Sequence, residues 1–361
     1  MGANTNIEWT DSTWNPLRGC SRVSEGCRNC YAEKVAYRFS GAGQAYEGLA
    51  ILRNGHAGWT GKVELVEKHL LDPLKWKGVP ELVPGSEGVE GQRAKGQTKL
   101  RRRRIFVNSM SDLFHESVPD AWIDRIFAVM ALCPQHDFQV LTKRPARMLA
   151  YFGGGFPHPG SDRVMAIRVA TAPLQSLAGY PRDAIHFPLP NVWLGVSVEN
   201  QVAADDRIPL LLQTAAAARF ISAEPLLGPV SLRWKNSTPF GTPHPRHLKP
   251  DPDGAGRVCT DEYDGLRELD WVIVGGESGA GGNTRSMKPS WARTLRDQCQ
   301  AANVPFFFKQ WGEWIPTEDP KVAEQRGVPL GECMSYVGKK AAGAQLDGRE
   351  WREFPREAIN G

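Results

Sequence analysis

The sequence contains no long uninterrupted hydrophobic run, and cysteine is scarce in it. The chain of 361 residues has only seven cysteines. Nowhere do about 18 apolar residues follow one another, so we expect no transmembrane helix and no membrane partner. The N-terminal residues are polar and lack the basic and apolar segments of a secretory signal peptide. These absences predict a cytoplasmic protein, where clustered cysteines more often bind metal or do chemistry than form disulfides.

The chain also lacks a strong excess of charge of either sign. It has 44 Lys and Arg residues against 40 Asp and Glu residues, which gives a formal net charge of +4. A charge this mild does not require a nucleic-acid partner, although it is compatible with one. The hydrophobic fraction of 41% is enough for a large core, and 361 residues fit a single α/β barrel.

Short apolar runs rich in β-branched and aromatic residues recur along the chain. Unbroken runs of this kind favour parallel strands that are buried on both faces. The predicted strands cover residues 13–20, 104–112, 137–145, 192–200, 219–228, 270–279 and 304–314. Segments with helical spacing lie between them, at 118–133, 200–218 and 288–303, and Pro209 is expected to interrupt the second.

This alternation of strands and helices predicts an α/β protein, a partial (β/α)6–7 TIM-like barrel of parallel strands with loop insertions. A doubly wound open sheet is the alternative, because strand order cannot be read from the sequence. Three segments rich in Gly, Pro or charge are long for compact connections, namely 77–104, 153–190 and 235–264. The β/α pattern continues on both sides of each, so we predict one domain over residues 1–361 with three insertions.

Nearly every predicted strand ends in hydroxyl, carboxylate or cationic side chains. The carboxyl ends of parallel strands meet at one edge, where barrel enzymes build their sites. Any one of these residues can simply face solvent, but Glu199, Glu224 and Glu277 all follow buried strands, and a buried carboxylate is costly unless paired. Their recurrence indicates a polar ligand. The strand-end residues are Asn108, Ser109, Ser111, Asp112, Thr142, Lys143, Arg144, Ser197, Glu199, Asn200, Ser222, Glu224, Gly275, Gly276, Glu277, Ser278, Lys309, Gln310 and Glu313.

Three of the seven cysteines, Cys20, Cys27 and Cys30, lie within the segment GCSRVSEGCRNCYAEK. Three is an odd number for disulfides and one short of a closed zinc site. The spacing C-x6-C-x2-C leaves four interpretations. They are a structural zinc site with a distant fourth ligand, a redox pair formed by Cys27 and Cys30, small buried hydrophobes, and a [4Fe–4S] cluster held by three thiolates with one iron open.

Several motifs together resemble the radical S-adenosylmethionine (SAM) superfamily. A three-cysteine loop after the first strand of a β/α barrel is typical of it. The segments IEWTDSTWNPLRGC, GCRNCYAE, FVNSMSDLFH, LTKRPARM, GVSVEN, SAEPLLGP, VGGESG and FFKQWGEW resemble an uncharacterised phage-associated branch, and CRNCY resembles spore photoproduct lyase, a DNA-repair member. The usual superfamily spacing is C-x3-C-x2-C with an aromatic residue before the third cysteine. Here the first gap is six residues, and the aromatic residue, Tyr31, follows Cys30.

The resemblance implies a radical SAM enzyme in which Cys20, Cys27 and Cys30 hold a [4Fe–4S] cluster. In such enzymes the cluster cleaves SAM reductively, and the resulting 5′-deoxyadenosyl radical abstracts a hydrogen atom from the substrate. It further implies a reducing electron donor such as flavodoxin or ferredoxin, and a substrate that is nucleic acid or a nucleotide, for repair or modification. The alternative is a non-enzymatic nucleic-acid-binding protein with a structural metal site, which predicts zinc and no SAM binding.

By strand position, the resemblance also assigns roles to the strand-end residues. The SAM contacts are Ser109, Ser111 and Asp112 for the amino group, Lys143 or Arg144 for the carboxylate, Ser197 and Glu199 for the ribose, Gly275, Gly276 and Glu277 for the adenosine, and Glu224. Lys309, Gln310 and Glu313 are assigned to the substrate side as candidate catalytic residues.

Overall fold

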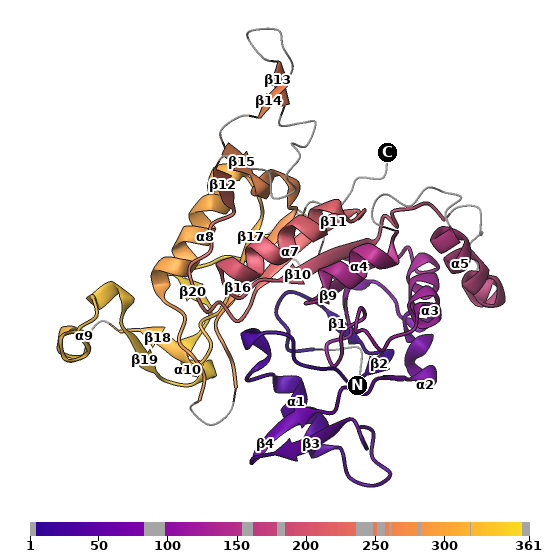
Figure 1. Ribbon diagram of the computed structural model, residues 1–361, viewed down its shortest axis with the longest axis horizontal. Coiled ribbons are helices and arrows are strands. Elements are labelled where there is room, and N and C mark those ends of the chain that lie inside the picture. The colour runs from indigo at the N-terminus through magenta and orange to yellow at the C-terminus, as the bar shows by residue number, and fades with distance from the viewer. Residues whose placement is uncertain are drawn as a thin grey trace, which may run out of the picture.

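The computed structural model describes residues 5–82, 98–153, 162–178, 185–235, 248–250, 257–259, 262–279, 283–317 and 319–355. Its main feature is a seven-stranded parallel sheet, curled into a half-barrel that turns through 208° (Figure 1). In spatial order its strands are β1 (Ser12–Trp14), β8 (Arg103–Val107), β9 (His136–Thr142), β10 (Val192–Ser197), β11 (Ala218–Ala223), β16 (Trp271–Gly275) and β17 (Phe306–Gln310).

The spatial order of these strands is also their order along the chain. A doubly wound sheet reverses its strand order at a switch point, and this sheet has no such reversal among its seven strands. The predicted partial TIM-like barrel is therefore confirmed, and the doubly wound alternative is excluded.

Two apolar layers bury the faces of the half-barrel. On the outer face, side chains such as Ile105, Val140 and Val272 belong to the main core, which they share with the helices. On the inner, concave face, a second core contains Trp9, Trp193, Phe220, Trp271, Ile273 and Phe307. Because both faces are covered, the strands are continuous apolar runs without alternation, which is why their positions could be predicted.

Helices cover the outer face of the sheet (Figure 1). They are α3 (Asp120–Ala131), α4 (Pro145–Tyr151), α7 (Gln201–Gln213) and α8 (Pro289–Ala302). The predicted interruption of α7 at Pro209 is wrong, because the helix continues through this residue. Pro209 removes one backbone hydrogen bond, but its neighbours Ile208 and Leu211 are fully buried, and their packing keeps the helix intact.

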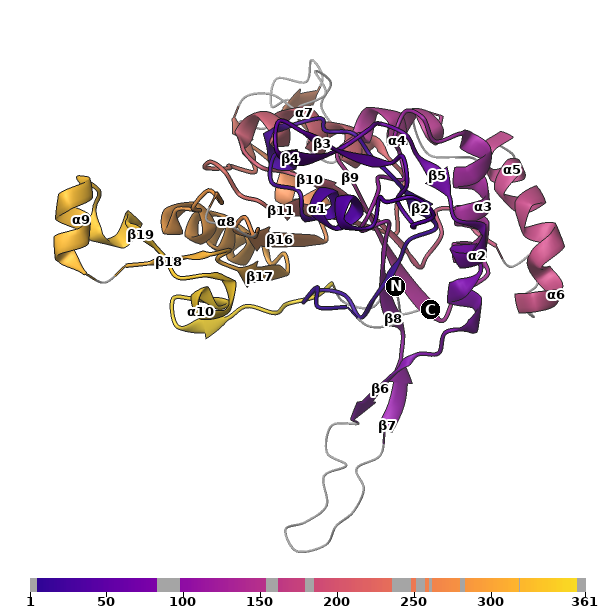
Figure 2. The ribbon, with the colours of Figure 1, turned by 90° about the horizontal axis from the view of Figure 1, so that it is seen from below.

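A small lobe forms part of the connection between β1 and β8, which are themselves paired in the sheet. We call residues 18–62 the cysteine lobe, because it contains the three clustered cysteines. Its elements are η1 (Glu25–Cys27), α1 (Tyr31–Arg38) and the antiparallel hairpin of β3 (Ala50–Arg53) and β4 (His56–Trp59). It has its own apolar core, with Ala36, Tyr46 and Trp59. Seen from below, α1 and the hairpin stand in front of β9, β10 and β11 (Figure 2).

Short elements lie at the start of this lobe and between the lobe and β8. Strand β2 (Leu17–Arg18) pairs with β5 (Glu64–Leu65), and α2 (Glu67–Leu70) and η2 (Asp72–Lys75) follow. After β17, β18 (Trp314–Pro316) pairs with β19 (Met334–Tyr336), and the same region contains α9 (Pro320–Arg326), η7 (Leu330–Glu332), α10 (Lys339–Ala342), β20 (Gln345–Leu346) and β21 (Arg349–Glu350).

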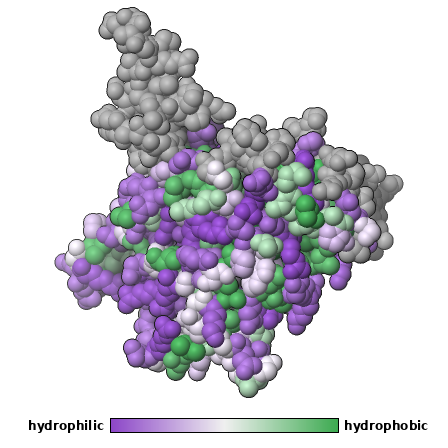
Figure 3. All heavy atoms as spheres, turned by 45° about the vertical axis from the view of Figure 1, so that its right-hand side comes forward, coloured by the Kyte–Doolittle hydropathy of each residue, from purple (hydrophilic) through white to green (hydrophobic). Residues whose placement is uncertain are grey.

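The three predicted insertions lie partly outside the described residues. Their described parts are β6 (Val79–Leu82) with β7 (Thr98–Arg101), then α5 (Asp162–Thr171), η3 (Ala172–Leu174) and α6 (Gln175–Ala178), then β12 (Arg233–Lys235), β13 (Leu248–Pro250), β14 (Arg257–Cys259) and β15 (Glu262–Asp264), followed by η6 (Gly265–Glu268). No helix in the described part of the chain is long and apolar enough to cross a bilayer. On the face in Figure 3, hydrophobic residues form small separate groups in a largely hydrophilic surface.

Candidate functional site

A cavity of about 250 Å³ opens at the carboxyl ends of the strands. Side chains that follow β8, β9, β11 and β16 line it together with residues of β10 and β17 and the segment from Cys20 to Tyr31. Ile7, Trp9, Phe106 and Leu141 provide an apolar part of the lining, continuous with the inner core. The predicted site residues that line the cavity are Cys20, Cys27, Cys30, Ser109, Ser111, Asp112, Lys143, Arg144, Ser197, Glu224, Gly276, Glu277 and Lys309.

Four predicted site residues do not line this cavity. Gln310 and Glu313 are buried against neighbouring segments, where the amide of Gln310 donates to the carbonyl of Gly276 at 2.9 Å and Glu313 accepts from the hydroxyl of Thr284 at 3.0 Å. Their predicted contact with substrate does not agree with this position. Gly275 faces Glu224 instead, and Glu199 lies behind the cysteine segment.

The three clustered cysteines converge on this one cavity. Each is partly buried, and none forms a disulfide. Burial, and after it the negative charge of Asp112, raises the pKa of the Cys20 thiol to about 12. Burial also raises the pKa of the Cys30 thiol. Metal binding here would therefore have to displace thiol protons, as it does in cysteine metal sites generally.

Three strand ends hold the segment that carries the cysteines. After β9, the guanidinium of Arg144 donates to the hydroxyl of Ser21 at 2.8 Å and to its carbonyl at 3.0 Å. After β10, Glu199 accepts a hydrogen bond from the hydroxyl of Ser24. After β16, Glu277 accepts from the amide of Asn29 at 2.8 Å. We call Arg144, Glu199 and Glu277 the loop anchors.

The anchor Arg144 is itself fixed by carboxylates. Its guanidinium donates to Asp112 at 3.0 Å and to Glu116 at 2.9 Å. Asp112 also accepts from the hydroxyl of Thr142 at 2.7 Å and from the backbone N–H groups of Lys143 and Phe114. Four protein donors thus already surround Asp112, so its main role in this arrangement is to orient Arg144.

The two glutamate anchors are paired with arginines. Glu199 accepts from Arg207 at 2.6 Å, and Glu277 accepts from the backbone N–H of Arg285 at 2.8 Å and from its guanidinium. Burial raises the pKa of Glu199, but the charges of Lys143 and Arg207 outweigh it, so the pKa lies below its usual value. Burial likewise raises the pKa of Glu277, but hydrogen bonds from Arg285 and Asn29 outweigh it, so this pKa also lies below its usual value. Both side chains are therefore carboxylates at neutral pH.

Other polar groups that line the cavity can still form hydrogen bonds or ion pairs with a ligand. Asn108 has φ 62° and is 3% exposed; its Oδ1 accepts from the backbone of Leu17, and its Nδ2 has no hydrogen-bond partner among the described residues. The hydroxyls of Ser197 and Ser222 and the ammonium group of Lys143 line the cavity and form no side-chain hydrogen bond or ion pair with any described residue. Asn108 and Ser222 are strand-end residues for which the sequence predicts no role, because no sequence pattern distinguishes an unpaired donor from a paired one.

At the ends of β11 and β17, the ammonium group of Lys309 donates to Glu224 at 2.6 Å. The side chains are 12% and 17% exposed, so both remain accessible from the cavity. Gly276 is required here for a separate reason. A Cβ atom on this residue would lie 2.0 Å from the carbonyl oxygen of Trp311, so only a glycine lets these two backbone segments pass so closely.

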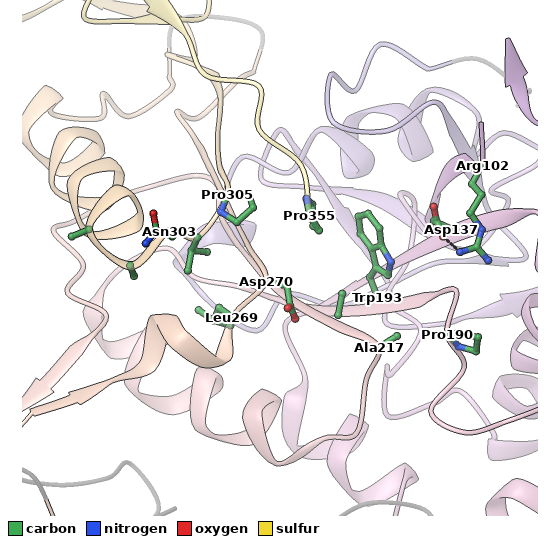
Figure 4. Close-up of a pocket in the computed structure, with 14 residues that line it drawn as sticks. Arg102, Asp137, Pro190, Trp193, Ala217, Leu269, Asp270, Asn303, Pro305 and Pro355 are labelled. Carbon is green, nitrogen blue, oxygen red and sulfur yellow. Dashed lines mark ion pairs between the residues drawn. The ribbon is translucent and has the colours of Figure 1, made fainter. Parts of the chain in front are cut away.

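A larger cavity of about 760 Å³ lies at the opposite, amino ends of the strands (Figure 4). Its charged groups are already paired, since Arg102 contacts Asp137 at 3.1 Å and Asp270 accepts from the backbone of Arg219 at 2.7 Å. The remaining lining is mainly Ala, Pro and other apolar residues, and it includes none of the predicted site residues. In barrels this end generally serves stability, so the first cavity is the candidate functional site.

Comparison with curated proteins and with solved structures gives no match. Residues 4–355 match a family model described as "Protein of unknown function (DUF5131)", which covers almost the whole chain. The chain therefore belongs to the DUF5131 family.

Proposed function

We propose that this protein is a radical SAM enzyme, with a [4Fe–4S] cluster on Cys20, Cys27 and Cys30 and SAM in the adjoining cavity. The single observation that supports it most is the position of the three cysteines. They share one cavity with the carboxyl ends of the strands of a partial barrel, which is where enzymes of this architecture build their sites.

The chemistry of the donor set supports the proposal. Three thiols, none of them in a disulfide, line one cavity. Cysteine thiolates are the usual ligands of a [4Fe–4S] cluster, in which each thiolate binds a different iron.

The chain's own residues would bind SAM and exclude water. When bound, the cluster would supply the electron for reductive cleavage of SAM and, through it, hydrogen abstraction from the substrate. Lys143 offers an ammonium group for the carboxylate of SAM, because Arg144 is already engaged by Asp112, Glu116 and Ser21. The unpartnered Nδ2 of Asn108 and the hydroxyls of Ser197 and Ser222 offer hydrogen bonds to polar atoms of SAM.

Anaerobic purification tests the proposal directly. We expect about four irons per chain and an absorbance shoulder that bleaches with dithionite. With dithionite and SAM, the protein should release 5′-deoxyadenosine, measured by chromatography. Each of the changes Cys20→Ala, Cys27→Ala and Cys30→Ala should abolish both iron retention and this product, because each removes one of three ligands.

Cys333→Ala provides the matched control, since Cys333 is also a free cysteine but lies outside the cavity. It should retain both the iron and the product. Stoichiometric zinc without iron, together with no SAM binding in a filter assay, would instead support the alternative of a nucleic-acid-binding protein with a structural metal site.

A further inference from the structure

The size of the cavity restricts how a substrate can reach it. The cavity of about 250 Å³ is open to one side, whereas pockets that enclose a small ligand are usually about 300–1,000 Å³. A ligand held beside the cysteines therefore leaves no enclosed space for a second small molecule. This inference rests on the proposed function, in which SAM is the ligand bound in the cavity. The reacting group of the substrate then enters from the open mouth. The surface beside the mouth should then recognise the rest of the substrate.

The cysteine lobe forms part of this surface, and it concentrates the positive charge of the chain. Residues 18–62 contain seven Lys and Arg residues against three Glu residues, a net charge of +4 that equals the net charge of the whole chain. Two of the glutamates are neutralised locally. Glu33 is buried against Arg22 at 2.5 Å, and Glu25 contacts Arg285 at 3.4 Å.

Several cations of the lobe remain available to a partner. Arg28, Arg38, Arg53 and Lys62 are exposed, and none has an ion pair with a described residue. The lobe thus carries exposed cations, and its segment from Cys20 to Tyr31, which includes Arg28, borders the cavity. The arginine run 101–104 offers no comparable surface, because Arg101 and Arg104 pair with Asp11 and Arg102 pairs with Asp137.

Exposed aromatic rings accompany these cations. Tyr31 is 47% exposed and lines the cavity, and its hydroxyl donates to the carbonyl of Ser109 at 2.7 Å, which fixes the ring at the mouth. Tyr37 and Phe39 follow at the other end of α1 and are 41% and 42% exposed. Single exposed aromatic side chains are common on protein surfaces, but here three of them lie in one small lobe that also carries exposed cations.

From these observations we infer that the cysteine lobe binds a single-stranded nucleic acid and directs one nucleotide into the cavity. Cations that follow a phosphate backbone and aromatic rings that stack on bases are the two elements of single-strand recognition. Arg28, Arg38, Arg53 and Lys62 supply the first, and Tyr31, Tyr37 and Phe39 supply the second. An acidic protein would complement the same charge, so binding of such a protein in place of a single strand is an outcome that the test below separates from this inference.

The test measures binding of a fluorescein-labelled single strand of about ten nucleotides to the full chain by fluorescence anisotropy. Tyr37→Ala should weaken binding about tenfold, which corresponds to the loss of one stacked base. Arg38→Ala and Lys62→Ala should each reduce the slope of log affinity against log salt by about one, because each removes one phosphate contact. The probes should be both DNA and RNA, without SAM.

Tyr336→Ala and Lys340→Ala are the matched controls, because they remove an exposed tyrosine and an exposed lysine outside the lobe. Both should bind as the unaltered protein does. The inference is overturned if the lobe variants match these controls, if dextran sulfate is bound with the same dependence on Tyr37, or if the lobe binds only a small acidic electron-carrier protein. The expected effects of the lobe variants on affinity and on the salt slope do not depend on whether the preparation contains iron. The proposal of nucleic-acid binding and the proposal of a radical SAM enzyme can therefore fail separately.

Discussion

Glu199 is 1% exposed, and both of its carboxylate oxygens have protein partners. Ser24 donates to one oxygen, and Arg207 donates to the other at 2.6 Å. A buried pair of this kind is strongly destabilising to break, because the remaining ion keeps its desolvation cost without its partner. The same geometry at an exposed position contributes little, because water screens it. Glu67 and Arg125 form such an exposed pair, also at 2.6 Å.

The change Glu199→Gln should therefore lower the free energy of unfolding by about 3 kcal/mol. The matched change Glu67→Gln should lower it by less than about 1 kcal/mol, because its pair is solvent-exposed. Urea denaturation of both variants measures the difference. Equal effects of the two changes would contradict the description of Glu199 as a buried anchor.

The pH dependence of this effect follows from the lowered pKa of Glu199. The pKa of a Glu side chain in the unfolded chain is about 4.3. A carboxyl group whose pKa is lower in the folded state stabilises the protein at pH values above this unfolded-state pKa. The stabilisation is lost as the pH falls through the folded-state pKa. The stability difference between the unaltered protein and Glu199→Gln should thus be largest at neutral pH and shrink below about pH 4.

At the scale of elements, the strands could be predicted and the anchors could not. Each strand is a local apolar run, so its position depends on neighbouring residues in the sequence. The partners of an anchor are remote: Asn29 and Glu277 are 248 positions apart, and Ser24 and Glu199 are 175 apart. The sequence therefore indicated buried carboxylates at strand ends but not that they bind the cysteine segment. The same limit applies to Gln310 and Glu313, whose burial is set by adjoining loops.

The concave face of the sheet depends on a glycine in β10. Gly195 lies directly opposite Phe220 of β11, and a Cβ atom on it would be 2.5 Å from the ring. Phe220 is 1% exposed and packs near Trp9 and Trp271 in the inner core, so its ring has no space to move into. The glycine thus makes room for the aromatic layer beneath the cavity.

Gly195→Ala should accordingly destabilise the protein by about 1–3 kcal/mol through overpacking. Gly58→Ala is the matched control, because a Cβ at this strand position meets no atom within 4 Å. Thermal unfolding followed by circular dichroism measures both. Combining Gly195→Ala with Phe220→Leu should recover part of the loss, since the smaller side chain frees space. A Gly195→Ala protein as stable as the Gly58→Ala protein would contradict this packing.

At the scale of the whole molecule, the cysteine segment connects distant parts of the half-barrel. It belongs to the connection between β1 and β8, yet its anchors follow β9, β10 and β16. A ligand that binds this segment only in the folded state should therefore stabilise the whole sheet, by an amount set by its affinity.

Reconstitution with iron and sulfide should thus raise the melting temperature of the protein by at least about 2 °C relative to the chelator-treated form. The triple variant C20A/C27A/C30A should show no rise, and a rise in this variant would contradict binding at the three cysteines. Thiols spaced closely in sequence can also bind iron in the unfolded chain, which reduces the stabilisation. The rise in melting temperature therefore depends on how much more tightly the folded state binds the iron. The anchors increase this difference because they hold the thiols in place before iron binds. Glu199→Gln, which keeps all three cysteines but loses an anchor, should show a smaller rise than the unaltered protein.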